Sequence, residues 1–66
     1  MPTVGELKKA VLTTTGLSIW EFNGKSSAYS RFWRKMDSMG SMKVEIPQEK
    51  YQVLFDEFMR LIANGG

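Results

Sequence analysis

The sequence predicts a small α+β domain that is mostly helical, with three helices and two short extended segments. Large apolar residues recur every three or four positions over residues 27–39 and 47–63, a pattern typical of helices with one buried face. Residues 42–46 instead alternate between apolar and charged side chains, as a half-buried strand does. The 66 residues suffice for a single domain, residues 1–66, with a small core.

The first helix is expected over residues 4–13. Thr3 and Glu6 have the spacing of a capping box, in which the Thr hydroxyl accepts a hydrogen bond from the N–H of Glu6 and the Glu carboxylate reaches back to the N–H of Thr3. The β-branched run over residues 13–15 has a poor helix propensity, and Gly16 is suited to the position after a helix. We therefore place the helix end near Thr13.

Residues 17–22 are expected to form a short strand or an extended loop held by aromatic side chains, because the segment mixes Ile19, Trp20 and Phe22 with polar residues. Asn23-Gly24 then predicts a turn. If this segment pairs with residues 42–46, the helix between them allows a parallel pair with a right-handed crossover.

The second helix is expected over residues 27–39, with Ser26 or Ser27 as N-cap and Gly40 just after the C-terminus. Pro47 ends the strand over residues 42–46 and suits the first turn of the third helix. That helix, residues 47–63, is the most regular part of the chain and carries six apolar side chains on one face: Tyr51, Leu54, Phe55, Phe58, Leu61 and Ile62.

The alternative fold is an all-α domain of three helices joined by extended connections, in which the strand-like segment forms an exposed edge. In either fold, residues 64–66 are expected to be a frayed tail, because Asn64 and the two glycines after it favour the end of a helix.

Composition excludes several classes of function. The chain has no Cys and no His, so we expect no disulfide, no metal site and no cofactor. No cluster of a nucleophile and a base can be proposed, and we therefore expect no enzymatic activity. The polar N-terminus and the absence of a run of about 18 apolar residues predict a cytoplasmic protein without a membrane partner.

Charge is distributed unevenly along the chain, although nine basic and seven acidic residues give a net charge of only +2. Residues 23–36 contain four cations and no acid, whereas residues 45–57 contain four acids and one Lys. On a helical wheel the second helix gathers cations and hydroxyls opposite its apolar stripe, and such groups bind phosphates. The residues predicted to contact nucleic acid are Lys25, Ser27, Arg31, Arg34, Lys35 and Ser38.

The hypothesis drawn from this face is a small, non-catalytic, nucleic-acid-binding regulatory protein. The competing interpretation of the same face is the ordinary polar side of a surface helix. A helix-turn-helix is not expected, because about thirteen residues separate the first two predicted helices and that motif allows three or four.

The alternative function is a protein-binding inhibitor or adaptor, of a size and composition similar to small phage or plasmid regulators, that binds a host protein. Its surface would combine aromatic and Met side chains: Trp20, Phe22, Met36, Met39 and Met42. We expect both Trp20 and Trp33 in the core, with Trp20 as an exposed anchor in the alternative. The oligomeric state is left open between a monomer and a homodimer.

Overall fold

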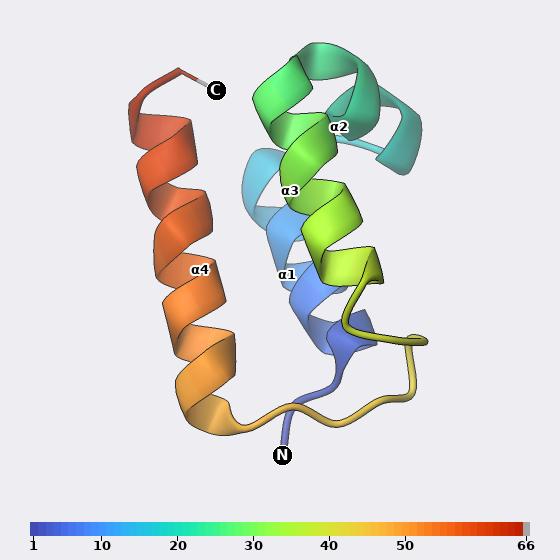
Figure 1. Ribbon diagram of the computed structural model, residues 1–66. Coiled ribbons are helices and arrows are strands. Elements are labelled where there is room, and N and C mark those ends of the chain that lie inside the picture. The colour runs from blue at the N-terminus through green and yellow to red at the C-terminus, as the bar shows by residue number, and fades with distance from the viewer. Residues whose placement is uncertain (66) are drawn as a thin grey trace.

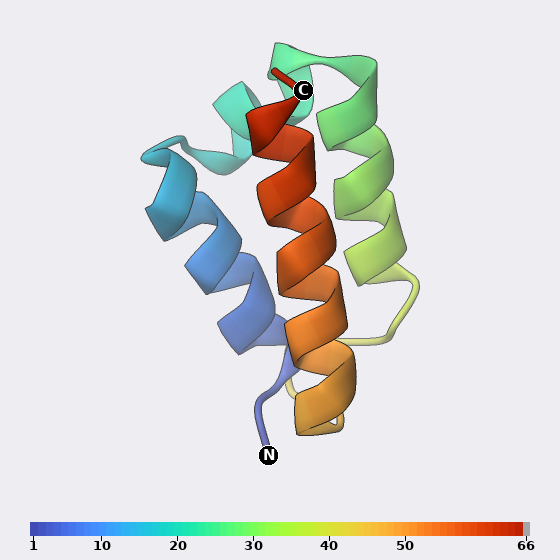
Figure 2. The same cartoon turned by 90° about the vertical axis from the view of Figure 1, so that its left-hand side faces the viewer.

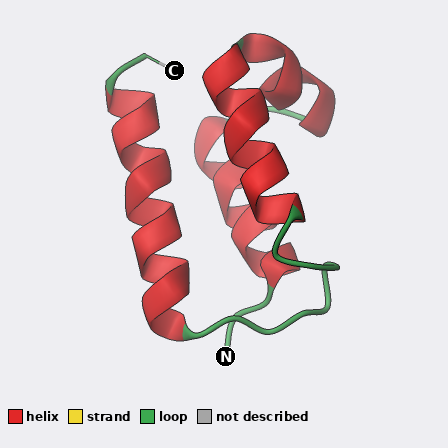
Figure 3. Ribbon diagram, in the orientation of Figure 1, coloured by secondary structure: helices red, strands yellow, loops and turns green. Residues whose placement is uncertain are grey.

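Four helices make up the fold, which is described for residues 1–65 by a computed structural model (Figure 3). They are α1 Val4–Thr15, α2 Ile19–Lys25, α3 Ser27–Asp37 and α4 Gln48–Ala63. No strand occurs within the described residues, so the predicted α+β fold with a two-stranded sheet is wrong. The all-α alternative has the right class but lacks one helix, because residues 17–22 were not expected to be helical.

The three longer helices form a bundle, and α2 lies across the end of it where α3 begins (Figure 1). In chain direction, α1 and α4 run the same way and α3 runs opposite to both. A second view shows α4 in front of α1 and α3, and all three pack on each other (Figure 2). The bundle measures 29 × 20 × 19 Å, and no helix within residues 1–65 is long and apolar enough to cross a lipid bilayer.

Helix α2 replaces most of the extended segment predicted over residues 17–22. Ser18 is its N-cap, and the Ser18 hydroxyl accepts a hydrogen bond of 3.3 Å from the Glu21 N–H and lies 3.0 Å from a Glu21 carboxylate oxygen. Asn23-Gly24, which predicted a turn, is inside this helix. Burial stabilises the helical conformation of this segment, because the helix places the Phe22 side chain fully in the core.

The predicted strand over residues 42–46 is wrong, because residues 42–43 form a turn closed by a hydrogen bond of 3.1 Å from the Val44 N–H to the Ser41 carbonyl oxygen, and the segment does not pair with residues 17–22. Its partner is the N-terminus, through an antiparallel bridge between Thr3 and Glu45 and a hydrogen bond of 2.8 Å from the Ile46 N–H to the Pro2 carbonyl oxygen. The predicted buried face of this segment is also wrong in part. Ile46 is buried, whereas the side chains of Met42 and Val44 are exposed.

The core is centred on Phe58, which is fully buried on α4. Its ring centroid lies 5.5 Å from that of Phe32 on α3 and 6.0 Å from that of Phe22 on α2. The remaining buried apolar side chains come from α1, α3, α4 and the connection before α4: Val4, Leu7, Val11, Tyr29, Trp33, Met36, Ile46 and Leu54. Trp20 is not among them, since it is 85% exposed, so the expectation of a buried Trp20 is wrong.

Helix ends differ slightly from the predicted boundaries. The first helix extends to Thr15 because Gly16 takes the left-handed conformation (φ 71°) that ends it. Helix α3 ends at Asp37, two residues earlier than expected, with Ser38 as its C-cap. At the C-terminus, the Asn64 and Gly65 N–H groups donate to carbonyls of α4, and Gly66 lies outside the described residues.

Candidate nucleic-acid interface

Helix α3 presents its cations to solvent because its other side is held in the core. The Ser26 hydroxyl caps the helix by accepting a hydrogen bond of 3.2 Å from the Tyr29 N–H. Tyr29 and the buried residues one turn further on fix the rotation of the helix, which leaves Arg31 and Arg34 exposed. Within residues 1–65, neither guanidinium forms an ion pair. Both charges are therefore available to a ligand.

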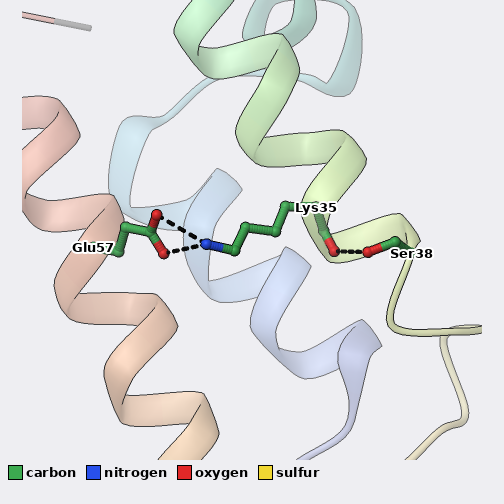
Figure 4. A network of polar contacts seen from close by, with 3 residues as sticks. All are labelled: Lys35, Ser38 and Glu57. Carbon is green, nitrogen blue, oxygen red and sulfur yellow. Dashed lines mark hydrogen bonds and ion pairs between the residues drawn. The ribbon is translucent and has the colours of Figure 1, made fainter.

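Lys35 connects α3 to α4 through an ion pair (Figure 4). Its ammonium lies 2.9 and 3.0 Å from the two carboxylate oxygens of Glu57, and both side chains are about half exposed. Ser38 supports the same turn, since its hydroxyl donates a hydrogen bond of 2.7 Å to the Lys35 carbonyl oxygen. An exposed pair of this kind contributes only about 0–1 kcal/mol, so Lys35 can exchange Glu57 for another anion at little cost.

An open cleft of about 430 Å³ lies between α3 and α4 beside this ion pair. Arg31 and Lys35 line it from α3, and Glu57 and Arg60 line it from α4. Three cations and one carboxylate give these walls a charge of +2 (3 − 1). The cleft thus concentrates on one surface a positive charge equal to the net charge of the whole chain, +2.

The structure brings together some of the predicted residues but not all. Arg31, Arg34, Lys35 and Ser38 share one side of α3, and Ser27 is exposed one turn before Arg31. Lys25 is apart from them, because its ammonium lies 5.8 Å from the centroid of the Tyr29 ring, on the opposite side of α3.

Sequence reasoning missed Arg60, which lies in the last turn of α4, beyond the acidic segment of residues 45–57. No local pattern pairs it with Arg31. Only the packing of α4 against α3 brings the two to the same cleft.

Helices α1 and α2 have the spacing of a helix-turn-helix, which the sequence did not predict. Three residues, 16–18, separate α1 from α2, and this is a length that such a turn allows. The second helix of this arrangement is nevertheless a poor match for phosphates, because its exposed side chains include Ile19, Trp20 and Glu21 and its one cation is Lys25. The helix suited to phosphate contacts remains α3.

The surface predicted for protein binding is divided between core and exterior. Phe22 and Met36 are fully buried and cannot contact a partner. Trp20 and Met42 are exposed, at 85% and 54%, and Met39 is partly buried. The exposed remainder lies at the start of α2 and in the connection before α4, away from the α3–α4 cleft.

Metal-binding groups do not gather anywhere in the part of the chain that the structure describes, since no three acidic side chains come together there. The three cations that line the α3–α4 cleft, Arg31, Lys35 and Arg60, have the charge and the hydrogen-bond donors that an anion requires. Comparison of the chain with protein-family models, with curated proteins and with solved structures found no match.

Proposed function

We propose that this chain is a small, non-catalytic regulatory protein that binds nucleic acid in the cytoplasm, with its phosphates on the α3–α4 surface. The observation that carries the proposal is the cleft lined by Arg31, Lys35 and Arg60, in which Glu57 is the acidic residue of the lining. Arg34 continues the same surface along the exposed side of α3. Cations held on a rigid helix bind phosphates and release the counterions condensed on the nucleic acid.

The binding supported by these side chains is electrostatic in character. The four cations Arg31, Arg34, Lys35 and Arg60 lie on two packed helices and match a phosphate backbone rather than base edges. Affinity should therefore fall steeply with salt, with a slope in log–log form of about −0.9 for each phosphate neutralised on duplex DNA.

A charge-reversal experiment tests the proposal. Binding of a labelled mixed-sequence DNA duplex is measured by fluorescence anisotropy for the parent protein and for Arg31→Glu with Arg34→Glu. Both side chains are exposed, so the double variant should fold normally, which circular dichroism checks. We expect a loss of affinity of about tenfold or more at low salt and a salt slope reduced by about 2.

The matched control is Lys43→Glu with Lys50→Glu. These lysines are also exposed and lie near the start of α4, outside the cleft, so the control changes net charge by the same amount at another place. Equal losses in the two double variants would show that binding follows net charge and not the cleft, and the proposal would fail. It would fail also if the parent protein binds no duplex at low salt.

The alternative function, a protein-binding inhibitor or adaptor, retains the support of the exposed Trp20. Two of the five side chains predicted for that surface, Phe22 and Met36, are in the core. Nucleic-acid binding is the better supported of the two functions, because each of the three predicted cations on α3 is exposed.

A further inference from the structure

A second hollow lies on the other side of α3, along α1, and it has a different chemical character. This groove has a volume of about 490 Å³ and is open to solvent along its length. Its apolar lining comes from α1, the start of α2, α3 and the connection before α4: Leu12, Ile19, Trp33 and Met42. Its polar lining includes Thr13 and the charged residues Glu6, Lys8 and Lys9. An apolar side chain from outside would fit it better than a phosphate.

Trp20 is beside this groove but does not fill it. The residue follows Ile19, which lines the groove, and yet the Trp20 side chain is 85% exposed. Exposed Trp at this level is unusual, because the indole carries more apolar area than almost any other side chain. One surface of the chain thus contains a large apolar projection and, next to it, an apolar hollow that is open.

We propose that the occupant of this groove is a second copy of the chain, with Trp20 of each copy inserted into the groove of the other. A projection and a hollow that are neighbours on one surface are self-complementary about a two-fold axis, which is the symmetry of most homodimers. Charge agrees with this pairing. Glu21, adjacent to Trp20, is exposed, and the groove lining has two lysines against the single acid Glu6, so the charge of the groove is opposite to that of Glu21.

The area of this interface predicts a weak dimer. Each indole buries about 150–250 Å², and the groove walls lose a comparable area, so that two reciprocal contacts bury roughly 600–1,000 Å² in total. This value is below the standard size of a stable protein interface. The dimer should therefore be populated near about 1 mM protein and be mostly dissociated near about 10 µM.

Sedimentation velocity over this concentration range, without nucleic acid, tests the proposal separately from the proposed function. We expect the weight-average mass of the parent protein to rise toward twice the monomer mass. Trp20→Ala removes the projection and should stay monomeric throughout. Thr13→Glu puts a carboxylate into the groove wall at an exposed position, where it repels Glu21 of the second copy, and should have the same effect from the other side of the contact.

Val53→Ala is the matched control, because Val53 is 65% exposed on α4 and does not line the groove. This variant should associate like the parent protein. The proposal is overturned if the parent protein remains a monomer near about 1 mM, in which case the groove is left to another kind of ligand. It is overturned equally if Trp20→Ala or Thr13→Glu, shown by circular dichroism to be folded, associates as strongly as the parent protein.

Discussion

The Lys35 ammonium has two possible anionic partners, the carboxylate of Glu57 and a phosphate of the proposed ligand. In the free protein both oxygens of Glu57 hold it across the α3–α4 cleft. A bound phosphate would compete for the same ammonium, and it would also meet the negative charge of Glu57 at close range. The carboxylate would therefore oppose the proposed phosphate binding in two ways, by occupying a cation and by repelling the ligand.

Replacing Glu57 with Gln should for this reason strengthen nucleic-acid binding. The substitution keeps the size of the side chain, removes its charge and releases Lys35. We expect the affinity for a DNA duplex to rise by about two- to fivefold at low salt and the gain to shrink as salt is added. Fluorescence anisotropy at two ionic strengths measures both effects.

Glu49→Gln is the control for this variant, since it removes one exposed carboxylate from the first turn of the same helix, outside the cleft. A gain of equal size in the Glu49 variant would mean that Glu57 acts only through net charge. An unchanged affinity in Glu57→Gln would contradict a role of the cleft in binding.

At the scale of single residues, the sequence was informative where helical periodicity decides exposure. The period of 3.6 residues correctly separated the exposed Arg31 and Arg34 from the buried Phe32 and Trp33. Arg60 could not be found in this way, because its position beside Arg31 depends on how two helices pack. Whether the cations bind nucleic acid stays a prediction.

Two glycines near the ends of helices, Gly16 and Gly24, have different conformational roles. Gly16 follows α1 with φ of 71°, a left-handed conformation in which its N–H donates to the Leu12 carbonyl oxygen at 2.8 Å. Gly24 lies within α2, is not among the glycines with positive φ, and has open space where a Cβ would be. The first position needs glycine, whereas the second is only weakened by it.

Gly24→Ala should stabilise the protein by about 0.5–1 kcal/mol, because Ala favours the helical conformation and costs less backbone entropy. Gly16→Ala should destabilise it by about 1 kcal/mol, because a Cβ is strained in the left-handed region. Urea unfolding followed by circular dichroism measures both. A destabilising Gly24→Ala would indicate that residues 23–24 form the turn predicted from the sequence and not a helix.

The signal for helix α2, which the sequence analysis did not predict, is the pair Ser18 and Glu21. These two residues have the same capping-box spacing as Thr3 and Glu6. The aromatic composition of residues 17–22 outweighed that signal and favoured a strand. Burial of Phe22 among rings from other helices decides the outcome, and this tertiary contact is invisible in local propensity. The three longer helices were predicted because their apolar stripes are continuous.

Across the whole molecule, stability depends on the aromatic cluster where α2, α3 and α4 meet. Phe58→Ala should lower the free energy of unfolding by about 3–5 kcal/mol, because the ring is fully buried and contacts Phe22 and Phe32. Val53→Ala, on the exposed side of α4, should change it by less than about 0.5 kcal/mol. Equilibrium urea unfolding measures the free energy of unfolding of both variants. A decrease below about 1 kcal/mol for Phe58→Ala would contradict the central place of Phe58 in the core.

The contact between Lys8 and Asp37 has a consequence for chemical labelling. Lys8 is paired with Asp37 across α1 and α3, its ammonium lies 5.3 Å from the Trp33 ring centroid, and its side chain is only 10% exposed. An amine-reactive reagent should modify the exposed Lys9 in the folded protein and reach Lys8 only when α1 and α3 separate. The ratio of the two rates, resolved by fragmentation mass spectrometry, then measures how often the bundle opens, and equal rates would mean that α1 is not held.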